Sequence, residues 1–430
     1  MMNGVWFMIF KIKNFGKIAD ANIKLDGITV ICGYNDTGKS TVGKAVFSFF
    51  NALTDYKNKI DAQKNSKLHA AIRNYAADPM DLPVKVLYPE NSMDFISKHD
   101  NYFSLDEVKE FLELSYGVKL PKDRLVSLVE YLNIPEIDIL NESVFRYIFN
   151  VMNGQIKNVY SSNYSHCSIS GEIQDFTNTI KINKQFCNCE LAEPIEHSVY
   201  YINNPFVLDL LNNPDRMNVL RSMNPMDRSA VYAIIKAQAD INADFMSNIL
   251  DSVINRSDLK KVEGVLKLAY RGDTKISNGK YFYTDENGND FDFRNISAGL
   301  KSFALIERLL ETGVLKKKDV LILDEPEIYL HSEWQMYYAE LIVLLQKFFD
   351  LTILLVTHSF QFLESLDFFM KKHGISSKGN YYIPETTENG FIMRACGNNP
   401  DDLKQNLSAG SVKLANLEID YDMKHEENDT

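Results

Sequence analysis

The sequence has few cysteines, and their arrangement excludes two common stabilising devices. Its five cysteines are an odd and scattered set: Cys32, Cys167, Cys187, Cys189 and Cys396. They show no zinc-ligand spacing, and an odd number does not fit a disulfide framework. This usage is typical of a reducing compartment, so we expect a cytoplasmic protein.

Long apolar runs are also missing. No stretch approaches the roughly 20 continuous apolar residues that a membrane span needs. The apolar N-terminal stretch is short, is interrupted by Lys11 and Lys13, and has no small-residue cleavage site behind it. We therefore interpret it as an opening strand and expect no membrane contact.

Positive charge is in deficit. The chain carries 46 lysines and arginines against 58 acidic residues, a formal net charge of -12. Binding nucleic acid over a wide surface requires the opposite balance, because lysine and arginine must neutralise phosphates. The lysines between residues 57 and 73 leave a local basic groove open, although their spacing fits a solvated helix face at least as well.

What is present is the composition of an ordinary globular protein. Of the 430 residues, 45% are hydrophobic and 24% are charged, which predicts one composite domain or two domains. The chain shows no internal repeat, no low-complexity tract and no long heptad pattern. These absences argue against a solenoid and against a coiled-coil arm.

A glycine-rich loop stands between a predicted strand at 21–32 and a predicted helix at 41–53, the context that a phosphate loop requires. Backbone N–H groups of such a loop surround phosphates, Lys39 reaches the outer phosphates, and the Ser40 hydroxyl binds Mg²⁺. The alternative is a glycine turn that begins a helix and binds nothing. The predicted ATP contacts are Gly33, Asn35, Asp36, Thr37, Gly38, Lys39, Ser40 and Thr41.

Two later apolar strands end in groups that can act on phosphate. The strand at 320–324 ends in Asp324 and is followed by Glu325. Asp324 would hold Mg²⁺ through water, and Glu325 would orient or deprotonate the attacking water. The strand at 352–357 leads into His358, where a neighbouring strand would present it to the γ-phosphate. Taken alone, acids or a histidine at a strand end are more often structural.

A fourth motif begins the predicted helix after residue 297. Ser297 and Gly299 precede an amphipathic stretch, and a serine and a glycine at a helix start form an anion site through free N–H groups. Simple capping of the helix by Ser297 is the plainer interpretation of this segment alone.

Together, in this order, the four motifs resemble those of ABC-type ATPases, and the wide gap between loop and signature resembles the RecF and SMC branch. The stretch from Asp324 to His331, DEPEIYLH, resembles the DEPE-x-x-LH element of bacterial OLD-like and RecF-like ATPases. The resemblance covers residues 7–50 and 290–360. It implies an α/β head: a mixed sheet sandwiched by helices, an antiparallel β subdomain and a helical insertion.

The resemblance also implies a dimer. Two subunits of such ATPases face head to tail, so Ser297 and Gly299 would act on ATP held by Lys39 of the other subunit, in a homodimer or a higher oligomer. Three positions depart from the family pattern: Asp36 and Ala298 replace glycines, and Leu300 replaces glutamine or glutamate. We expect slow hydrolysis from these departures.

The pattern of elements predicts five segments. They are an N-terminal core lobe with the phosphate loop at 1–53, a helical insertion at 54–160, a β subdomain with a helical subdomain at 161–295, a C-terminal core lobe at 296–400, and a C-terminal helix and tail at 401–430.

Three functions fit such an ATPase. The first is a sensor or switch that controls a separate effector, a nuclease or a toxin, in bacterial anti-phage defence. The second is a RecF-like ATPase that clamps DNA, which the net charge and the missing heptads disfavour. The third is a self-contained OLD-like nuclease, but the one Asp-x-Asp after His358, at Asp420 and Asp422, has too little chain behind it to complete a catalytic sheet.

Overall fold

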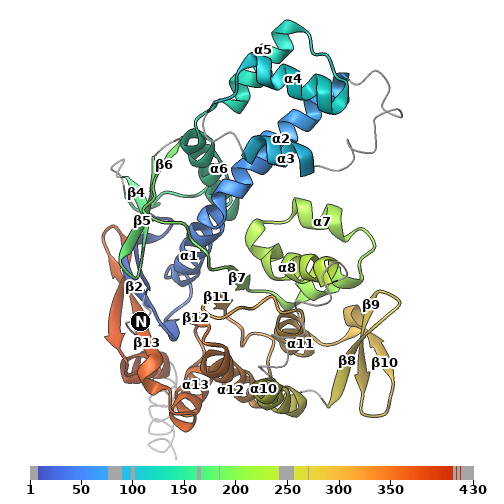
Figure 1. The fold of residues 1–430 in the computed structure, drawn as a ribbon. Coiled ribbons are helices and arrows are strands. Elements are labelled where there is room, and N and C mark those ends of the chain that lie inside the picture. The colour runs from blue at the N-terminus through green and yellow to red at the C-terminus, as the bar shows by residue number, and fades with distance from the viewer. Residues whose placement is uncertain are drawn as a thin grey trace, which may run out of the picture.

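The fold is built on one large mixed sheet (Figure 1). The computed structural model describes residues 8–75, 90–97, 102–161, 166–183, 185–241, 256–269, 271–409, 413 and 417. Eleven strands lie in the order β6-β5-β4-β1-β2-β14-β13-β3-β12-β11-β7. This architecture confirms the α/β class predicted from the sequence.

One end of the sheet is parallel. It contains β3 (Ile28–Cys32), β12 (Thr352–Thr357), β11 (Val320–Asp324) and β7 (Val199–Ile202), each parallel to its neighbour. Their residues are buried almost throughout, because helices cover both faces of this part. The carboxyl ends of the four strands therefore meet at one edge, where ligands of open α/β sheets bind.

Alternate residues of these strands face two different cores. Ile31, Ile322 and Leu354 pack with α1 (Lys39–Leu53) and α6 (Glu136–Val151). Leu321 and Ile353 pack on the opposite side with α11 (Ala298–Glu311), α12 (Ser332–Phe349) and α13 (Phe360–Lys372). Period-two alternation in a strand buried on both faces produces this division.

The other end of the sheet is antiparallel. It contains β1 (Met8–Phe15), β2 (Ile18–Leu25), β4 (Cys167–Ile173), β5 (Phe176–Ile182) and β6 (Cys187–Glu190). A hairpin of β13 (Gly379–Thr387) and β14 (Gly390–Gly397) joins the two ends, with β13 parallel to β3 and β14 parallel to β2. This hairpin lies inside the sheet, between β2 and β3.

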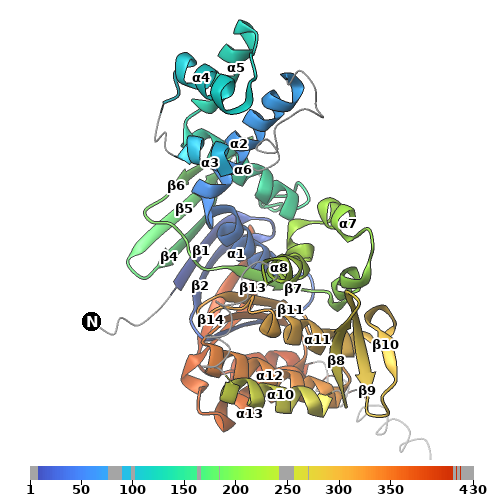
Figure 2. The same ribbon diagram turned by 45° about the vertical axis from the view of Figure 1, so that its right-hand side comes forward.

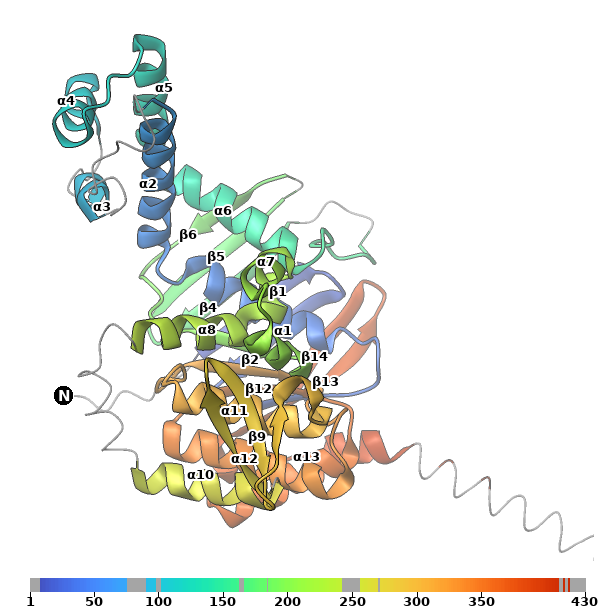
Figure 3. The ribbon, with the colours of Figure 1, turned by 90° about the vertical axis from the view of Figure 1, so that its right-hand side faces the viewer.

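A helical arm extends away from the sheet (Figure 3). It contains α2 (Tyr56–Tyr75), α3 (Glu90–Ser97), α4 (Leu105–Tyr116) and α5 (Lys122–Leu132). Leu68, Phe103 and Leu132 belong to a separate small core inside the arm. The helix α6 packs instead on α1 and β6, so the 54–160 segment contributes to two cores.

The remaining elements flank the parallel end of the sheet (Figure 2). They are η2 (Pro205–Asn212), α7 (Arg216–Ser222), α8 (Pro225–Ile241), α10 (Arg256–Ala269), η3 (Phe293–Asn295), η4 (Ser376–Lys378) and a three-stranded sheet of β8 (Gly272–Ser277), β9 (Lys280–Asp285) and β10 (Asp290–Asp292). In this small sheet β9 and β10 form an antiparallel hairpin. Residues 242–255 of the expected helical subdomain and residues 418–430 of the expected C-terminal tail lie outside the described residues. Within the described part, no helix is long and apolar enough to cross a membrane.

Candidate nucleotide site

The phosphate loop joins β3 to α1 and has a backbone that few residues tolerate. Asp36 and Gly38 have φ angles of 67° and 81°, in the left-handed region. Aspartate enters this region more readily than most residues, which explains how Asp36 replaces a glycine there. A Cβ on Gly38 would lie 2.7 Å from the Ile18 Cδ1 atom, so this position excludes a side chain. Among the described residues no side chain caps α1, which leaves the N–H groups at its start available to an anion.

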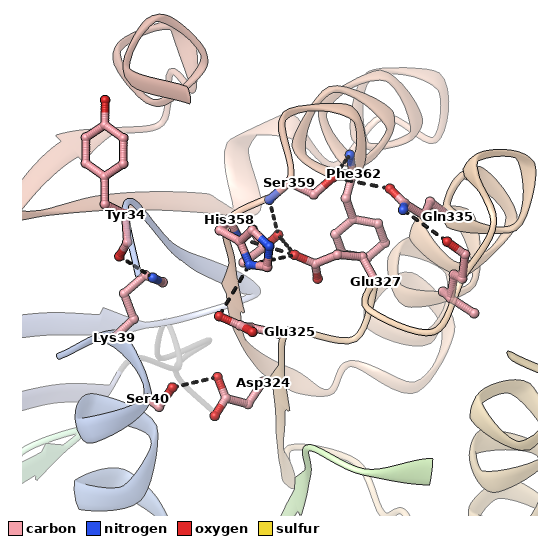
Figure 4. Close-up of polar contacts among 12 residues, drawn as sticks. Tyr34, Lys39, Ser40, Asp324, Glu325, Glu327, Gln335, His358, Ser359 and Phe362 are labelled. Carbon is pink, nitrogen blue, oxygen red and sulfur yellow. Dashed lines mark hydrogen bonds and ion pairs between the residues drawn. The ribbon is translucent and has the colours of Figure 1, made fainter. Parts of the chain in front are cut away.

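Lys39 is held beneath the loop. It is 4% exposed, and its Nζ donates to the Tyr34 carbonyl oxygen at 2.6 Å (Figure 4). Burial lowers the pKa of Lys39, while the negative charges of Glu325 and Asp324 act in the opposite direction. A cation taken out of water beside an anion-binding loop gains from a phosphate charge.

Asp324 is fixed by two hydroxyl groups. Ser40 Oγ donates to its Oδ1 at 3.0 Å, and the Tyr201 hydroxyl donates to its Oδ2 at 2.6 Å. Burial raises the pKa of Asp324, and both hydrogen bonds lower it. Ser40 and Asp324 thus present two neighbouring oxygen donors, the ligand type that Mg²⁺ prefers.

Sequence reasoning missed Tyr201. It lies in β7, and no local pattern in the sequence indicates that β7 pairs with β11 beside Asp324. Gly43 of α1 makes the approach possible, because a Cβ there would lie 3.2 Å from a Tyr201 ring carbon. The two adjacent tyrosines in this short strand were the available signal, since a buried hydroxyl needs a partner.

Glu325 and His358 meet where β11 and β12 end. Glu325 has a φ of 52°, and its N–H donates to the Val356 carbonyl at 2.8 Å. Its Oε1 lies 3.3 Å from His358 Nδ1. A non-glycine residue in a left-handed conformation is costly and is often associated with a functional position. The structure therefore brings together the two groups that the sequence assigned to catalysis.

Glu327 is a buried carboxylate that contacts His358 of this pair. It is 4% exposed, and its Oε1 accepts hydrogen bonds from the Thr357 hydroxyl at 2.5 Å and from the His358 N–H at 3.2 Å. His358 Nδ1 lies 3.7 Å from the same oxygen. The other carboxylate oxygen is buried with no hydrogen-bond partner among the described residues. The sequence identified Glu327 as part of a family element but assigned it no role.

Changing Glu327 to Gln is expected to stabilise the free chain in a pH-dependent way. Burial raises the pKa of Glu327 above its ordinary value of 4.5. The native state then binds this proton more tightly than the unfolded state, so wild-type stability falls as the pH rises through the window above 4.5. The amide of the E327Q variant has no such titration, and its carbonyl oxygen can keep both hydrogen bonds.

Urea unfolding across pH 5 to 8 measures this difference, with Glu333→Gln on α12 as the control. The stability advantage of E327Q over wild type should grow with pH, and that of the control should not change. An advantage independent of pH would mean that the carboxyl carries no burial penalty.

A hollow of about 220 Å³ opens beside the loop. It is lined by Lys17, Asn35, Asp36, Thr37, Gly38, Lys39, Ser40, Thr41 and Glu325. Seven of the predicted nucleotide contacts in the loop, all except Gly33, thus share one hollow with the predicted catalytic acid. Lys17, from the turn between β1 and β2, is a further lining residue that sequence reasoning did not identify.

The predicted signature residues do not line this hollow in the described part of the chain. Ser297 is exposed at the start of α11 and accepts a hydrogen bond from the Leu300 N–H at 3.3 Å. Ser297 therefore caps α11, which is the simpler of the two roles that the sequence allows for it. Gly299 packs tightly: a Cβ there would lie 2.8 Å from the Trp334 ring and 3.1 Å from the Tyr329 carbonyl oxygen.

Comparison with known proteins fits this geometry. A family model described as "AAA ATPase domain" matches residues 8–363. No curated protein matches the chain. Solved structures similar to this chain include an SMC head domain from Thermotoga maritima, with 10% identity, a TM-score of 0.38, and coverage of 91% of this chain and 99% of that one.

Two further SMC head structures are similar at the same level. One, bound to the C-winged helix domain of ScpA, has 9% identity, a TM-score of 0.46, and coverage of 91% and 98%. The other, with an extended coiled coil and bound to the C-terminal domain of ScpA derived from Pyrococcus furiosus, has 8% identity, a TM-score of 0.41, and coverage of 90% and 96%. The family match spans most of the chain and includes the phosphate loop, Asp324, Glu325 and His358. The chain belongs to the AAA ATPase domain family.

Proposed function

We propose that the chain is an ATP-dependent switch that dimerises around ATP and hydrolyses it slowly. One observation carries the proposal: the hollow unites the phosphate loop with Glu325 but is not lined by Ser297 or Gly299. Ser297 is exposed and stands at a helix start, where N–H groups attract anions. If a second copy of the chain placed the start of its α11 against the hollow, the nucleotide site would be complete.

Within one half-site, each residue has a distinct task. The free N–H groups of the loop and the Lys39 ammonium bind the β- and γ-phosphates. The hydroxyl of Ser40 and the carboxylate of Asp324, 3.0 Å apart, fit Mg²⁺ together with phosphate oxygens and water. Bound Mg²⁺ would neutralise charge that develops on the phosphates.

Glu325 orients and deprotonates the attacking water, and His358 contacts the γ-phosphate. The 3.3 Å contact between them keeps the carboxylate at the end of β11 turned toward the end of β12. Slow turnover is proposed from the departures at Asp36, Ala298 and Leu300. A slow ATPase suits a switch, because the ATP-bound state then lasts long enough to act on another protein.

The output of the switch is a separate effector protein, a nuclease or toxin of anti-phage defence. The arm of α2 to α5 is the proposed docking element, because it has its own core and extends away from the sheet. It exposes large apolar side chains, with Leu114 77% and Tyr102 71% exposed. Isolated apolar residues are common on surfaces, so their role needs a direct test.

Co-purification with the product of the adjacent gene tests this output. We expect a stoichiometric partner that the Leu114→Glu variant loses and that the control Leu268→Glu variant, changed at a 58% exposed leucine of α10, retains. No partner, together with DNA binding that weakens steeply with salt, would contradict the effector switch and favour the DNA-clamping alternative.

A further inference from the structure

The turn between β1 and β2 forms one wall of the nucleotide hollow, although it precedes the phosphate loop in the chain. A Cβ on Gly16, whose φ is 57°, would lie 2.8 Å from Thr41 Cγ2. A Cβ on Gly38 would lie 3.4 Å from the Cβ of Lys17. The turn therefore rests directly on the loop and on the first turn of α1.

Hydrogen bonds from two other segments fix this turn. The Gly16 N–H donates to the Ile156 carbonyl at 2.8 Å, and the Lys17 carbonyl accepts from the Phe391 N–H at 3.0 Å. The backbone of Lys17 is thus held on both sides. A side chain that leaves such a backbone is positioned in advance, which lowers the entropy lost when it contacts a ligand.

Lys17 lines the hollow, and its ammonium group forms an ion pair with Asp36, which lines the hollow as well. The lining then contains two ammonium groups, of Lys17 and Lys39, and two carboxylates, of Asp36 and Glu325. Asp36 is 80% exposed and the Lys17 side chain 34% exposed, so water screens their attraction and the pair separates at little cost. A nucleotide phosphate offers Lys17 a stronger partner, since it carries more charge and more acceptor oxygens.

We propose that Lys17 is a second cationic ligand for the nucleotide phosphates, and that Asp36 holds its ammonium in place until the nucleotide arrives. Binding exchanges the ion pair with Asp36 for one with phosphate. Asp36 then opposes binding, because it competes for Lys17 and places a negative charge beside the phosphates. This proposal rests on the proposed function, which places ATP in the hollow.

A competing account gives Lys17 no ligand role: it neutralises Asp36 and nothing more. The two accounts differ in a double-mutant cycle. If Lys17 binds phosphate, removing it weakens binding whether or not residue 36 is charged. If it only neutralises Asp36, removing it has no effect once Asp36 is replaced by Asn.

Isothermal titration of the full chain with ADP and with ATP decides between them. The Lys17→Ala variant should bind about tenfold more weakly or worse, the loss of one charge-assisted hydrogen bond. D36N should bind more tightly than wild type. The K17A/D36N double variant should be about tenfold weaker than D36N alone.

Lys11→Ala is the matched control, because it removes a lysine of the preceding strand β1 that also pairs with a carboxylate, at Glu172, but does not line the hollow. It should bind as wild type does. Lys17→Gln, which keeps the aliphatic stem, should reproduce the K17A loss, and circular dichroism establishes that each variant is folded.

The proposal is overturned if K17A/D36N binds as tightly as D36N, or if K17A and K17Q bind as K11A does. These results leave the proposed function intact. A wild-type chain that binds no nucleotide would instead contradict the proposed function itself.

Discussion

Glu325→Gln is expected to bind ATP, to hydrolyse it at least about 100-fold more slowly than wild type, and to remain a dimer while ATP is present. The amide keeps the size of the carboxylate, so the shape of the hollow survives. It does not accept a proton from water at neutral pH, so the step that would release the dimer is lost. Sedimentation with and without ATP, together with a phosphate-release assay, measures both effects.

The control for this result is Glu333→Gln, which removes a carboxylate on α12 that does not line the hollow. It should hydrolyse ATP at the wild-type rate. An unchanged turnover in E325Q would refute the assignment of Glu325 as the residue that activates water. A monomer that binds ATP stoichiometrically would refute the trapped dimer.

Lys39→Ala is expected to weaken ATP binding by at least about 100-fold. This loss corresponds to about 3 kcal/mol of binding free energy, the contribution of one hydrogen bond to a charged group. Lys39 is nearly buried under the loop, so its charge acts on phosphate with little screening by water. The chain should still fold. Burial lowers the pKa of Lys39, which means that its charged form is costly in the folded chain, and removing it does not cost a favourable ion pair.

Equilibrium titration with ATP measures the loss in K39A, and thermal unfolding verifies the fold. Lys11→Ala again serves as the control for a change of one unit of charge. Retention of wild-type affinity in K39A would show that ATP does not bind at this loop.

The sequence predicted the parts of the site that are local in the chain. The loop from Gly33 to Ser40 is readable because strand, glycine turn and helix follow one another directly, and each has its own pattern. The strands that end near Asp324 and His358 are readable because parallel strands buried on both faces have continuous apolar runs. Parallel neighbours then bring their carboxyl ends to one edge.

The parts that depend on pairing between distant segments were not predictable in this way. Tyr201 reaches Asp324 because β7 pairs with β11, and Lys17 reaches the hollow because its turn rests on Gly38. Neither contact leaves a periodic signal in the sequence. The same holds for the hairpin of β13 and β14, which joins the two ends of the sheet by pairing with β3 and β2.

Asp36 shows how structure changes the meaning of a departure from a family pattern. From the sequence, its charge predicts weaker binding of phosphates. In the structure its left-handed backbone suits an aspartate, and its carboxylate pairs with Lys17. The charge of Asp36 is therefore balanced in the free chain. Its effect on nucleotide binding depends on whether Lys17 stays paired with Asp36 or pairs with a phosphate.

The central claim is that ATP is held between two copies, with Lys39 from one and Ser297 from the other. Mixing two inactive variants, Lys39→Ala and Ser297→Arg, tests it most directly. The claim predicts that each variant alone hydrolyses no ATP and that the mixture regains activity, because a mixed dimer contains one site with both residues intact. A mixture as inactive as its components, with dimers of both kinds formed, would contradict it.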